Sequence, residues 1–138
     1  MSNSIANSFV NIFPEDWSPD NPDLRPDIIR YDQFVYQLFK ADTYREQLYH
    51  ATLGVCSEAG ELSDAVKKHL AYGKPLDLHN VIEELGDLRF YMQAIQNMLG
   101  ISEQDLLQAN ATKLQERYRG LKYSDQAAIT RADKNENR

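Results

Sequence analysis

From Asp27 onward, apolar residues recur at every third or fourth position, the spacing that places side chains on one face of an α-helix. The first such stretch predicts a helix over about residues 28–41, with Asp27 as a candidate N-cap. Its apolar face comprises Tyr31, Phe34, Val35, Leu38 and Phe39. Regular structure is therefore expected to begin with a short amphipathic helix.

A longer second helix is predicted over about residues 44–71. Thr43 and Glu46 form a capping-box pattern at its start, and the sequence Gly73-Lys74-Pro75 breaks the helix at its end. Its apolar stripe comprises Leu48, Val55, Ala59, Leu62, Val66 and Leu70. The predicted length makes this helix the longest in the chain.

Two further helices complete the pattern. Asp77 can cap a third helix that ends at Gly100, and Ser102 with Asp105 opens a fourth over about residues 103–118. The third helix has the stripe Val81, Leu85, Leu88, Met92, Ile95 and Leu99. The fourth is expected to direct Leu107, Ala111, Leu114 and Tyr118 toward the core. With no alternating strand pattern and short connections, the predicted fold class is all-α, a four-helix arrangement of mostly antiparallel neighbours.

The two ends of the chain differ from this helical part. Four of the five prolines lie in the first 26 residues, namely Pro14, Pro19, Pro22 and Pro26. Because proline blocks helix continuation, residues 1–27 are predicted to form an irregular arm. Trp17 and its apolar neighbours indicate that the arm packs on the body or on a partner. A helical domain is expected at 28–124 and a polar tail at 125–138.

Composition excludes several classes of function. The 138 residues include 15 Lys and Arg against 21 Asp and Glu, a net charge of −6, which argues against a nucleic-acid polymer as partner. No apolar run approaches the roughly 18–20 residues of a membrane span, and the start lacks a secretory signal, so we expect a cytoplasmic protein without a membrane partner. Cys56, the single cysteine, cannot form an internal disulfide or a zinc site.

Two acidic motifs stand out, Glu58-Ala-Gly-Glu61 and Glu84-Leu-Gly-Asp87, separated by the 22 residues from 62 to 83. Each places two carboxylates one turn apart on one helix face. At a rise of about 1.5 Å per residue, Glu61 and Asp87 both lie roughly 15 Å from the turn at residues 72–76, so they are predicted to face each other. Glu58 lies one turn farther away and Glu84 one turn nearer. All four carboxylates are therefore expected to converge.

Such a cluster favours a metal site. Four like charges repel one another unless cations intervene, and oxygen ligands without histidine or cysteine indicate Mg²⁺ or Mn²⁺. Acid pairs are also common on solvated helix faces, and that interpretation stays open. A di-iron carboxylate site fits less well, because it uses Glu-x-x-His and no histidine here follows a glutamate by three. His50 is interpreted as a surface or core-border residue.

The predicted fourth helix carries a complementary polar face. Asn110, Lys113 and Arg117 are spaced by three and four residues, which places them on one side of the helix. A neutral hydrogen-bonding group and two cations suit a sugar and its phosphates. A solvated helix face is the alternative.

Four segments together resemble the MazG-like branch of the all-α nucleoside triphosphate pyrophosphohydrolases. They are His50–Glu61, Tyr72–Asp77, Glu83–Asp87 and Asn110–Tyr118, and the resemblance covers about residues 28–124. It implies a helical core assembled as a homodimer or homotetramer. It also implies cleavage of a nucleoside triphosphate between the α and β phosphates, giving the monophosphate and pyrophosphate with Mg²⁺.

By position, the resemblance assigns Glu58, Glu61, Glu84 and Asp87 as catalytic metal ligands. It assigns Asn110, Lys113 and Arg117 to substrate binding, with Lys122 closing over the site. Two departures are visible. Ser57 stands where members often have a further acid, which leaves the general base open, and Arg119-Gly120 follows Tyr118 where Tyr-Pro is usual.

The short form and the Tyr72–Asp77 loop resemble versions encoded by bacteriophages, for which the location would be the host cytoplasm. Among these is the MazZ branch, which acts on dGTP. A purine dNTP, dGTP or dATP, is accordingly the expected substrate. dUTPase or phosphoribosyl-ATP pyrophosphatase activity, and a non-enzymatic helical dimerisation or partner-binding module, are the alternatives.

The expected mechanism is metal-assisted hydrolysis. A triphosphate brings about −4 and the four carboxylates another −4, so two or three divalent cations per site are needed to hold both together. Lys113 and Arg117 would bind phosphates and stabilise charge on the leaving pyrophosphate. Trp17 is a candidate for stacking on the base, with plain packing of the arm as the alternative.

Overall fold

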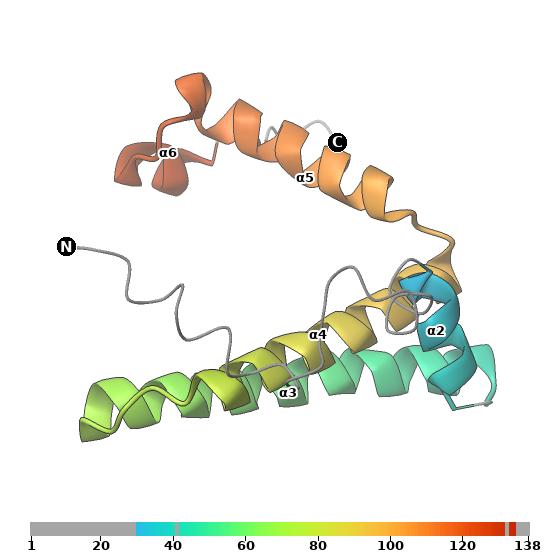
Figure 1. Ribbon diagram of the computed structural model, residues 1–138. Coiled ribbons are helices and arrows are strands. Elements are labelled where there is room, and N and C mark those ends of the chain that lie inside the picture. The colour runs from blue at the N-terminus through green and yellow to red at the C-terminus, as the bar shows by residue number, and fades with distance from the viewer. Residues whose placement is uncertain (1–29, 41, 132, 135–138) are drawn as a thin grey trace, which may run out of the picture. The chain divides into compact units, whose positions relative to one another are not determined.

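The computed structural model describes residues 30–40, 42–131 and 133–134 and shows helices and no strand in them (Figure 1). The elements are α2 (Tyr31–Leu38), α3 (Tyr44–Tyr72), α4 (Leu78–Leu99), α5 (Glu103–Arg117), the 3₁₀ turn η3 (Arg119–Leu121) and α6 (Asp125–Thr130). The all-α fold class is confirmed. The predicted arm at 1–27, including Trp17, lies outside the described residues.

Capping groups set the helix ends at the predicted positions. Thr43 and Glu46 form the complete capping box, with the Glu46 N–H donating to Thr43 Oγ1 at 3.4 Å. Gly73 ends α3 in the left-handed region at φ 63°, a conformation that favours glycine. The Asn80 N–H donates to Asp77 Oδ1 at 3.1 Å, and Ser102 caps α5 in the same way. The predictions of α3, α4 and α5 are confirmed to within one or two residues.

The two ends of the helical part depart from prediction. α2 ends at Leu38 and not near residue 41, because Phe39 is extended, with φ −74° and ψ 140°. The predicted polar tail contains α6, whose first turn is capped by Ser124, with the Ala127 N–H donating to Ser124 Oγ at 3.1 Å. The segment predicted as a polar tail thus contains a short exposed helix stabilised by a capping serine, and the domain boundary after residue 124 stays a prediction.

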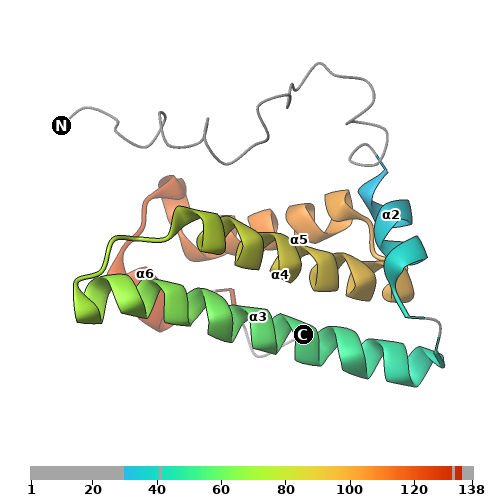
Figure 2. The same cartoon turned by 60° about the horizontal axis from the view of Figure 1, so that its bottom comes forward.

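Compact packing divides the chain after Met98 into two units, residues 1–98 and 99–138. In the first unit α3 and α4 run side by side as an antiparallel pair (Figure 2), and α2 packs near the Ala94 end of α4. Val35, Ala51 and Ala94 are its buried centre, surrounded by half-buried aromatic rings. His50 lies at the border of this core, 5.2 Å from the Phe39 ring by centroids, as predicted.

Small residues allow α3 and α4 to approach closely. Ala51, Gly54 and Ala65 are the buried residues of α3. A Cβ atom added at Gly54 would overlap the ring of Tyr91 on α4. Tyr91 itself packs edge-on against Phe90 at 5.4 Å between centroids. The short distance between α3 and α4 thus depends on small residues of α3, with Gly54 lying directly against the Tyr91 ring.

The stripe predicted for α2 supplies the buried Val35, but several members of the stripes predicted for α3, α4 and α5 are exposed in the single chain. On α4, Leu85 is 50% exposed and Met92 40%, whereas the buried residues are Glu84, Gln93, Ala94 and Gln96. On α3, Leu70 is 75% exposed, and the predicted core side chains Leu107 and Leu114 of α5 are also exposed. The buried side of α4 is therefore more polar than its predicted apolar stripe. The spacing of large apolar residues does not predict this, because α3 contacts α4 through small residues.

Candidate metal and nucleotide site

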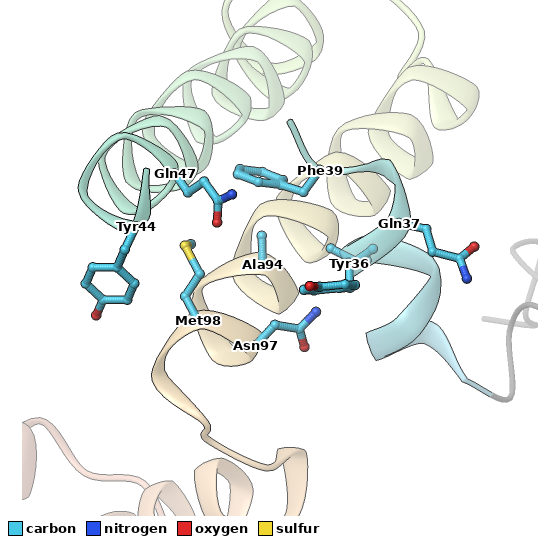
Figure 3. A pocket seen from close by; sticks show the side chains of 9 residues that line it. Tyr36, Gln37, Phe39, Tyr44, Gln47, Ala94, Asn97 and Met98 are labelled. Atoms are coloured by element: carbon cyan, nitrogen blue, oxygen red, sulfur yellow. The ribbon is translucent and has the colours of Figure 1, made fainter. Parts of the chain in front are cut away.

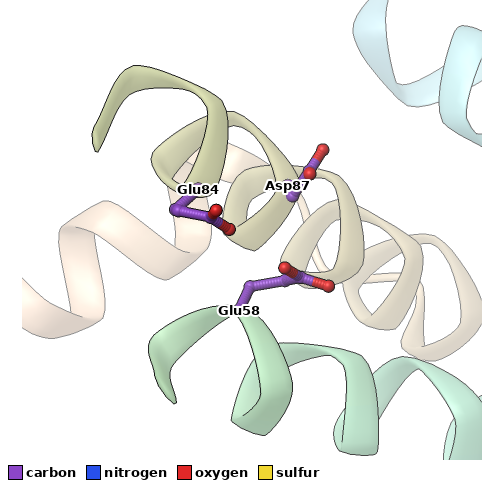
Figure 4. Close-up of side chains that lie close together, drawn as sticks. All are labelled: Glu58, Glu84 and Asp87. Carbon is purple, nitrogen blue, oxygen red and sulfur yellow. The ribbon is translucent and has the colours of Figure 1, made fainter. Parts of the chain in front are cut away.

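Three carboxylates from α3 and α4 gather at one place. One oxygen from each of Glu58, Glu84 and Asp87 lies within 4.8 Å of the others (Figure 4). Glu84 is buried at 6% exposure, Glu58 is half-buried and Asp87 is exposed. Exposure of the cluster residues therefore falls from Asp87 through Glu58 to Glu84.

The electrostatics of the cluster centre on Glu84. Burial, the charge of Glu61 and a hydrogen bond with Glu58 raise the pKa of the Glu84 carboxyl. Each of these influences disfavours the ionised form, and a cation at the cluster would favour it. The donor set is all hard carboxylate oxygen, which fits Mg²⁺ or Mn²⁺ and fits zinc or iron less well.

Glu61 occupies a different position from the one predicted. The group within 4.8 Å contains Glu58, not Glu61, together with Asp87. Glu61 instead lines a small polar pocket of about 220 Å³ together with Glu84. The predicted facing of Glu61 and Asp87 was therefore off by one turn. Close contact of Gly54 with Tyr91 fixes this register, a tertiary constraint that counting residues from the turn omits.

The same pocket contains residues that the sequence analysis missed. Asp64, Lys68 and Asn80 line it. Asp64 accepts from Lys67 Nζ at 2.6 Å and from Lys68 Nζ at 2.7 Å, and these hydrogen bonds lower the pKa of Asp64 to about 2. The signal was present in the sequence, because positions 61, 64 and 68 share one face of the helix.

In the second unit, Asn110 and Lys113 are exposed on α5, and Lys122 is exposed after η3. Arg117 is different. Its Nε and NH2 donate to the two oxygens of Asp133 at 2.6 and 2.7 Å, and the Asp133 side chain is only 1% exposed. This pairing lowers the pKa of Asp133 to about 2 and raises the pKa of Arg117. Asp133 lies in the predicted tail and was not foreseen as a partner.

A groove of about 450 Å³ lies where α2 meets α3 and α4 (Figure 3). Aromatic side chains and carboxamides line it, among them Tyr36, Phe39, Gln47 and Asn97. The Gln47 Nε2 donates to the carbonyls of Lys40 and Asp42 at 3.1 and 3.0 Å, so the side-chain oxygen is the acceptor that remains. The groove combines stacking surfaces with a fixed acceptor.

Comparison with known families agrees with the site. The family model described as the MazG nucleotide pyrophosphohydrolase domain matches residues 47–121, more than half of the chain, and the match includes both acidic motifs and all of α5. The fold and the site thus define an all-α nucleotide pyrophosphohydrolase. The chain belongs to the MazG family.

Membership makes the chain a nucleoside triphosphate pyrophosphohydrolase and sets aside the non-enzymatic helical module. The carboxylate cluster fits the divalent-metal dependence of this family. No curated protein and no solved structure matches the chain. None of the helices in the described residues is long and apolar enough to cross a membrane.

Proposed function

We propose that this enzyme hydrolyses a purine deoxynucleoside triphosphate to the monophosphate and pyrophosphate with Mg²⁺ or Mn²⁺. The observation that carries the proposal is the cluster of Glu58, Glu84 and Asp87 on two helices of the family's matched segment. Three acids held within one ion's reach around a buried carboxylate are costly without a cation, so their placement supports metal binding.

The residues that would hold the metal are the three cluster acids, with Glu61 beside Glu84 as a fourth. Bound divalent cations lower the pKa of water and polarise the phosphate. The carboxylates contribute about −4 and a triphosphate another −4, so we propose two or three ions per site. Glu84 anchors the cluster from its buried position, and Asp87 faces the open side where substrate enters.

We assign the substrate-contacting roles on α5 to Asn110 for the sugar and to Lys113 and Arg117 for phosphates, with Lys122 closing the site. Exposure of Asn110, Lys113 and Lys122 is compatible with these roles. Arg117 uses two of its N–H groups on Asp133, and a guanidinium has five, so donors are left for phosphate. Asp133 would then orient Arg117.

The groove beside α2 supports recognition of the base. Ala94 lies seven residues beyond Asp87 on α4, about 10 Å along the helix, a separation that the sugar and α-phosphate of a nucleotide can bridge. Rings stack on bases, and the Gln47 oxygen suits an exocyclic amino group, which adenine, guanine and cytosine carry and uracil lacks. This favours dATP or dGTP over dUTP. The resemblance of the Tyr72–Asp77 loop to phage-encoded versions, among them the MazZ branch that acts on dGTP, is consistent with that choice.

We further propose a homodimer or homotetramer. Leu85 and Met92 on α4, together with Leu70 on α3, expose large apolar area in the single chain. Large apolar side chains left exposed in this way are typical of an interface between subunits. A second copy would cover the stripes that the sequence predicts as core.

The test is product analysis with the eight common NTPs and dNTPs in Mg²⁺ or Mn²⁺. Monophosphate and pyrophosphate from a purine dNTP are expected, and stepwise release of orthophosphate or absence of turnover would refute the proposal. Glu84→Gln should lower kcat by more than about 100-fold and abolish Mn²⁺ binding measured calorimetrically. Glu83→Gln is the matched control, because Glu83 is the adjacent, exposed acid outside the cluster.

A further inference from the structure

The Gln47 side chain lines the groove beside α2 with a carboxamide whose orientation is fixed. Its nitrogen donates to the backbone carbonyls of Lys40 and Asp42, at 3.1 and 3.0 Å. A rotation that exchanged nitrogen and oxygen would place the oxygen against two carbonyl oxygens and break both hydrogen bonds. In Figure 3 the oxygen points toward the part of the groove that Met98 lines. Gln47 therefore offers the groove an acceptor and no donor.

Asn97, another carboxamide of the groove, has partners for both its nitrogen and its oxygen. The nitrogen donates to the Asp32 carbonyl at 2.7 Å, and the oxygen accepts from Gln93 Nε2 at 2.9 Å. These hydrogen bonds connect α4 to α2, so Asn97 holds the wall of the groove in place. Within the described part of the chain, by contrast, no group donates to the oxygen of the half-buried Gln47.

The lining around Gln47 suits a planar base. Tyr36 and Phe39 supply rings, and Ala94 and Met98 supply apolar contacts. The edge of a base that enters among such groups loses water, so a polar group on that edge needs a partner from the protein. An exocyclic amino group gains this partner by donating to the Gln47 oxygen. A carbonyl group at the same place repels that oxygen, and a hydrogen on carbon leaves it unpaired.

The separation between Gln47 and the acids fits one nucleotide. Gln47 lies eleven residues before Glu58 on α3, about 16 Å along the helix axis. A purine, its sugar and its α-phosphate cover this separation together with a hydrogen bond at one end and a metal ion at the other. The acceptor and the acids can thus contact opposite ends of the same nucleoside monophosphate unit.

We propose that Gln47 selects bases that carry an amino group, by accepting a hydrogen bond from the exocyclic amine of guanine or adenine. This proposal rests on the proposed function and adds to it the residue and the hydrogen bond that decide the base. Thymine and uracil carry carbonyl groups and no exocyclic amine, so the enzyme hydrolyses dTTP and dUTP poorly. The purine hypoxanthine lacks the amine as well, which separates the effect of hydrogen bonding from that of size.

The experiment compares purine triphosphates that differ by one amino group. dITP is dGTP without its 2-amino group, and purine deoxyriboside triphosphate is dATP without its 6-amino group. Wild type should prefer the amino-bearing member of at least one pair by roughly three- to tenfold in kcat/KM, the contribution of one neutral hydrogen bond. Gln47→Met keeps an unbranched side chain without the acceptor and should reduce that preference to within about twofold. Each ratio is measured within one enzyme preparation, so a lower folded fraction does not change it.

Two further variants serve as controls. Gln47→Glu keeps an oxygen acceptor at the same position and should retain the preference. Gln33 is exposed on α2 and does not line the groove, so Gln33→Met should leave every ratio unchanged. Equal use of both members of each pair by wild type, or a preference that Gln47→Met keeps, would overturn the proposal. If wild type releases no pyrophosphate from any triphosphate, the proposed function itself fails, which distinguishes the two failures.

Discussion

Arg117 and Asp133 form a two-point ion pair within the C-terminal unit, with N···O distances of 2.6 and 2.7 Å. Both oxygens of Asp133 are used, and its side chain is almost fully shielded from water. The pair links the end of α5 to the residues that follow α6. It therefore stabilises the C-terminal segment and sets the orientation of a guanidinium proposed to bind phosphate.

Asp133→Asn is expected to lower the melting temperature and to raise the KM for triphosphate by roughly three- to tenfold, because Arg117 loses its charged partner and its fixed orientation. The kcat at saturating substrate should change less. Steady-state kinetics and thermal denaturation check both effects. An unchanged KM with a lowered melting temperature would show that the pair is structural only.

The same pair predicts a pH dependence of stability. Because the pKa of Asp133 falls from its ordinary 3.8 to about 2, the folded protein binds fewer protons than the unfolded chain between these values. The contribution of the pair is thus fully present above about pH 4 and is lost as the pH falls toward 2. Acid unfolding followed by circular dichroism should show this extra loss in wild type and not in Asp133→Asn.

Gly54→Ala tests the close approach of α3 and α4. The added Cβ would overlap the Tyr91 ring, and overpacking of this kind costs about 1–3 kcal/mol. Since Gly54 lies one turn before Glu58, a displaced helix would also weaken metal binding. Denaturant unfolding and Mn²⁺ titration are the two measurements.

Gly60→Ala is the matched control on the same helix. A Cβ at Gly60 meets nothing within 4 Å, so only helix propensity changes, and stability should rise by up to about 1 kcal/mol. A destabilised Gly60→Ala with an unaffected Gly54→Ala would contradict the packing described for this helix pair.

The sequence predicts the helices well because their ends are local. The capping box at Thr43, the left-handed Gly73 and the N-caps Asp77 and Ser102 each act over three or four residues, and each is found where expected. The sequence also predicts that the acids of the two motifs lie close together, because the two helices form a hairpin and each residue advances the helix by a known distance.

What the sequence does not predict depends on contacts between elements. The register that pairs Glu58, not Glu61, with Asp87 follows from Tyr91 lying against Gly54. Pairing of Arg117 with Asp133 joins residues sixteen apart through a short helix that looked like a tail. Burial of Glu84 in place of Leu85 depends on which side of α4 meets small residues.

Self-association is expected to depend on the exposed face of α4. Leu85 and Met92, seven residues apart on one side of the helix, are predicted to lie in the subunit interface. Leu85→Glu should shift the protein toward the monomer at micromolar concentration, as measured by light scattering. Wild type that is monomeric under these conditions would contradict the proposed assembly, whatever the variant does.

Base recognition has two candidate locations, the groove and the arm. Tyr36 lines the groove and is 77% exposed, so its removal should leave the core intact. Base–aromatic stacking is worth about 1–3 kcal/mol, so Tyr36→Ala should raise the KM of the preferred nucleotide by at least about fivefold. Tyr72→Ala is the control. Tyr72, the last residue of α3, is also largely exposed but does not line the groove.

Deletion of residues 1–18 tests the arm, which contains Trp17 and lies outside the described residues. If the arm completes the base site, the truncated enzyme should keep metal-dependent cleavage, because the acids on α3 and α4 are intact, while its preference among bases flattens. Tyr36→Ala in the truncated enzyme should then cause little further loss of base preference. The arm and Tyr36 would form one base site, and the effects of changes within one site are not additive. A truncated enzyme that folds and keeps its base ranking, but loses that ranking on Tyr36→Ala, would place selectivity in the groove alone.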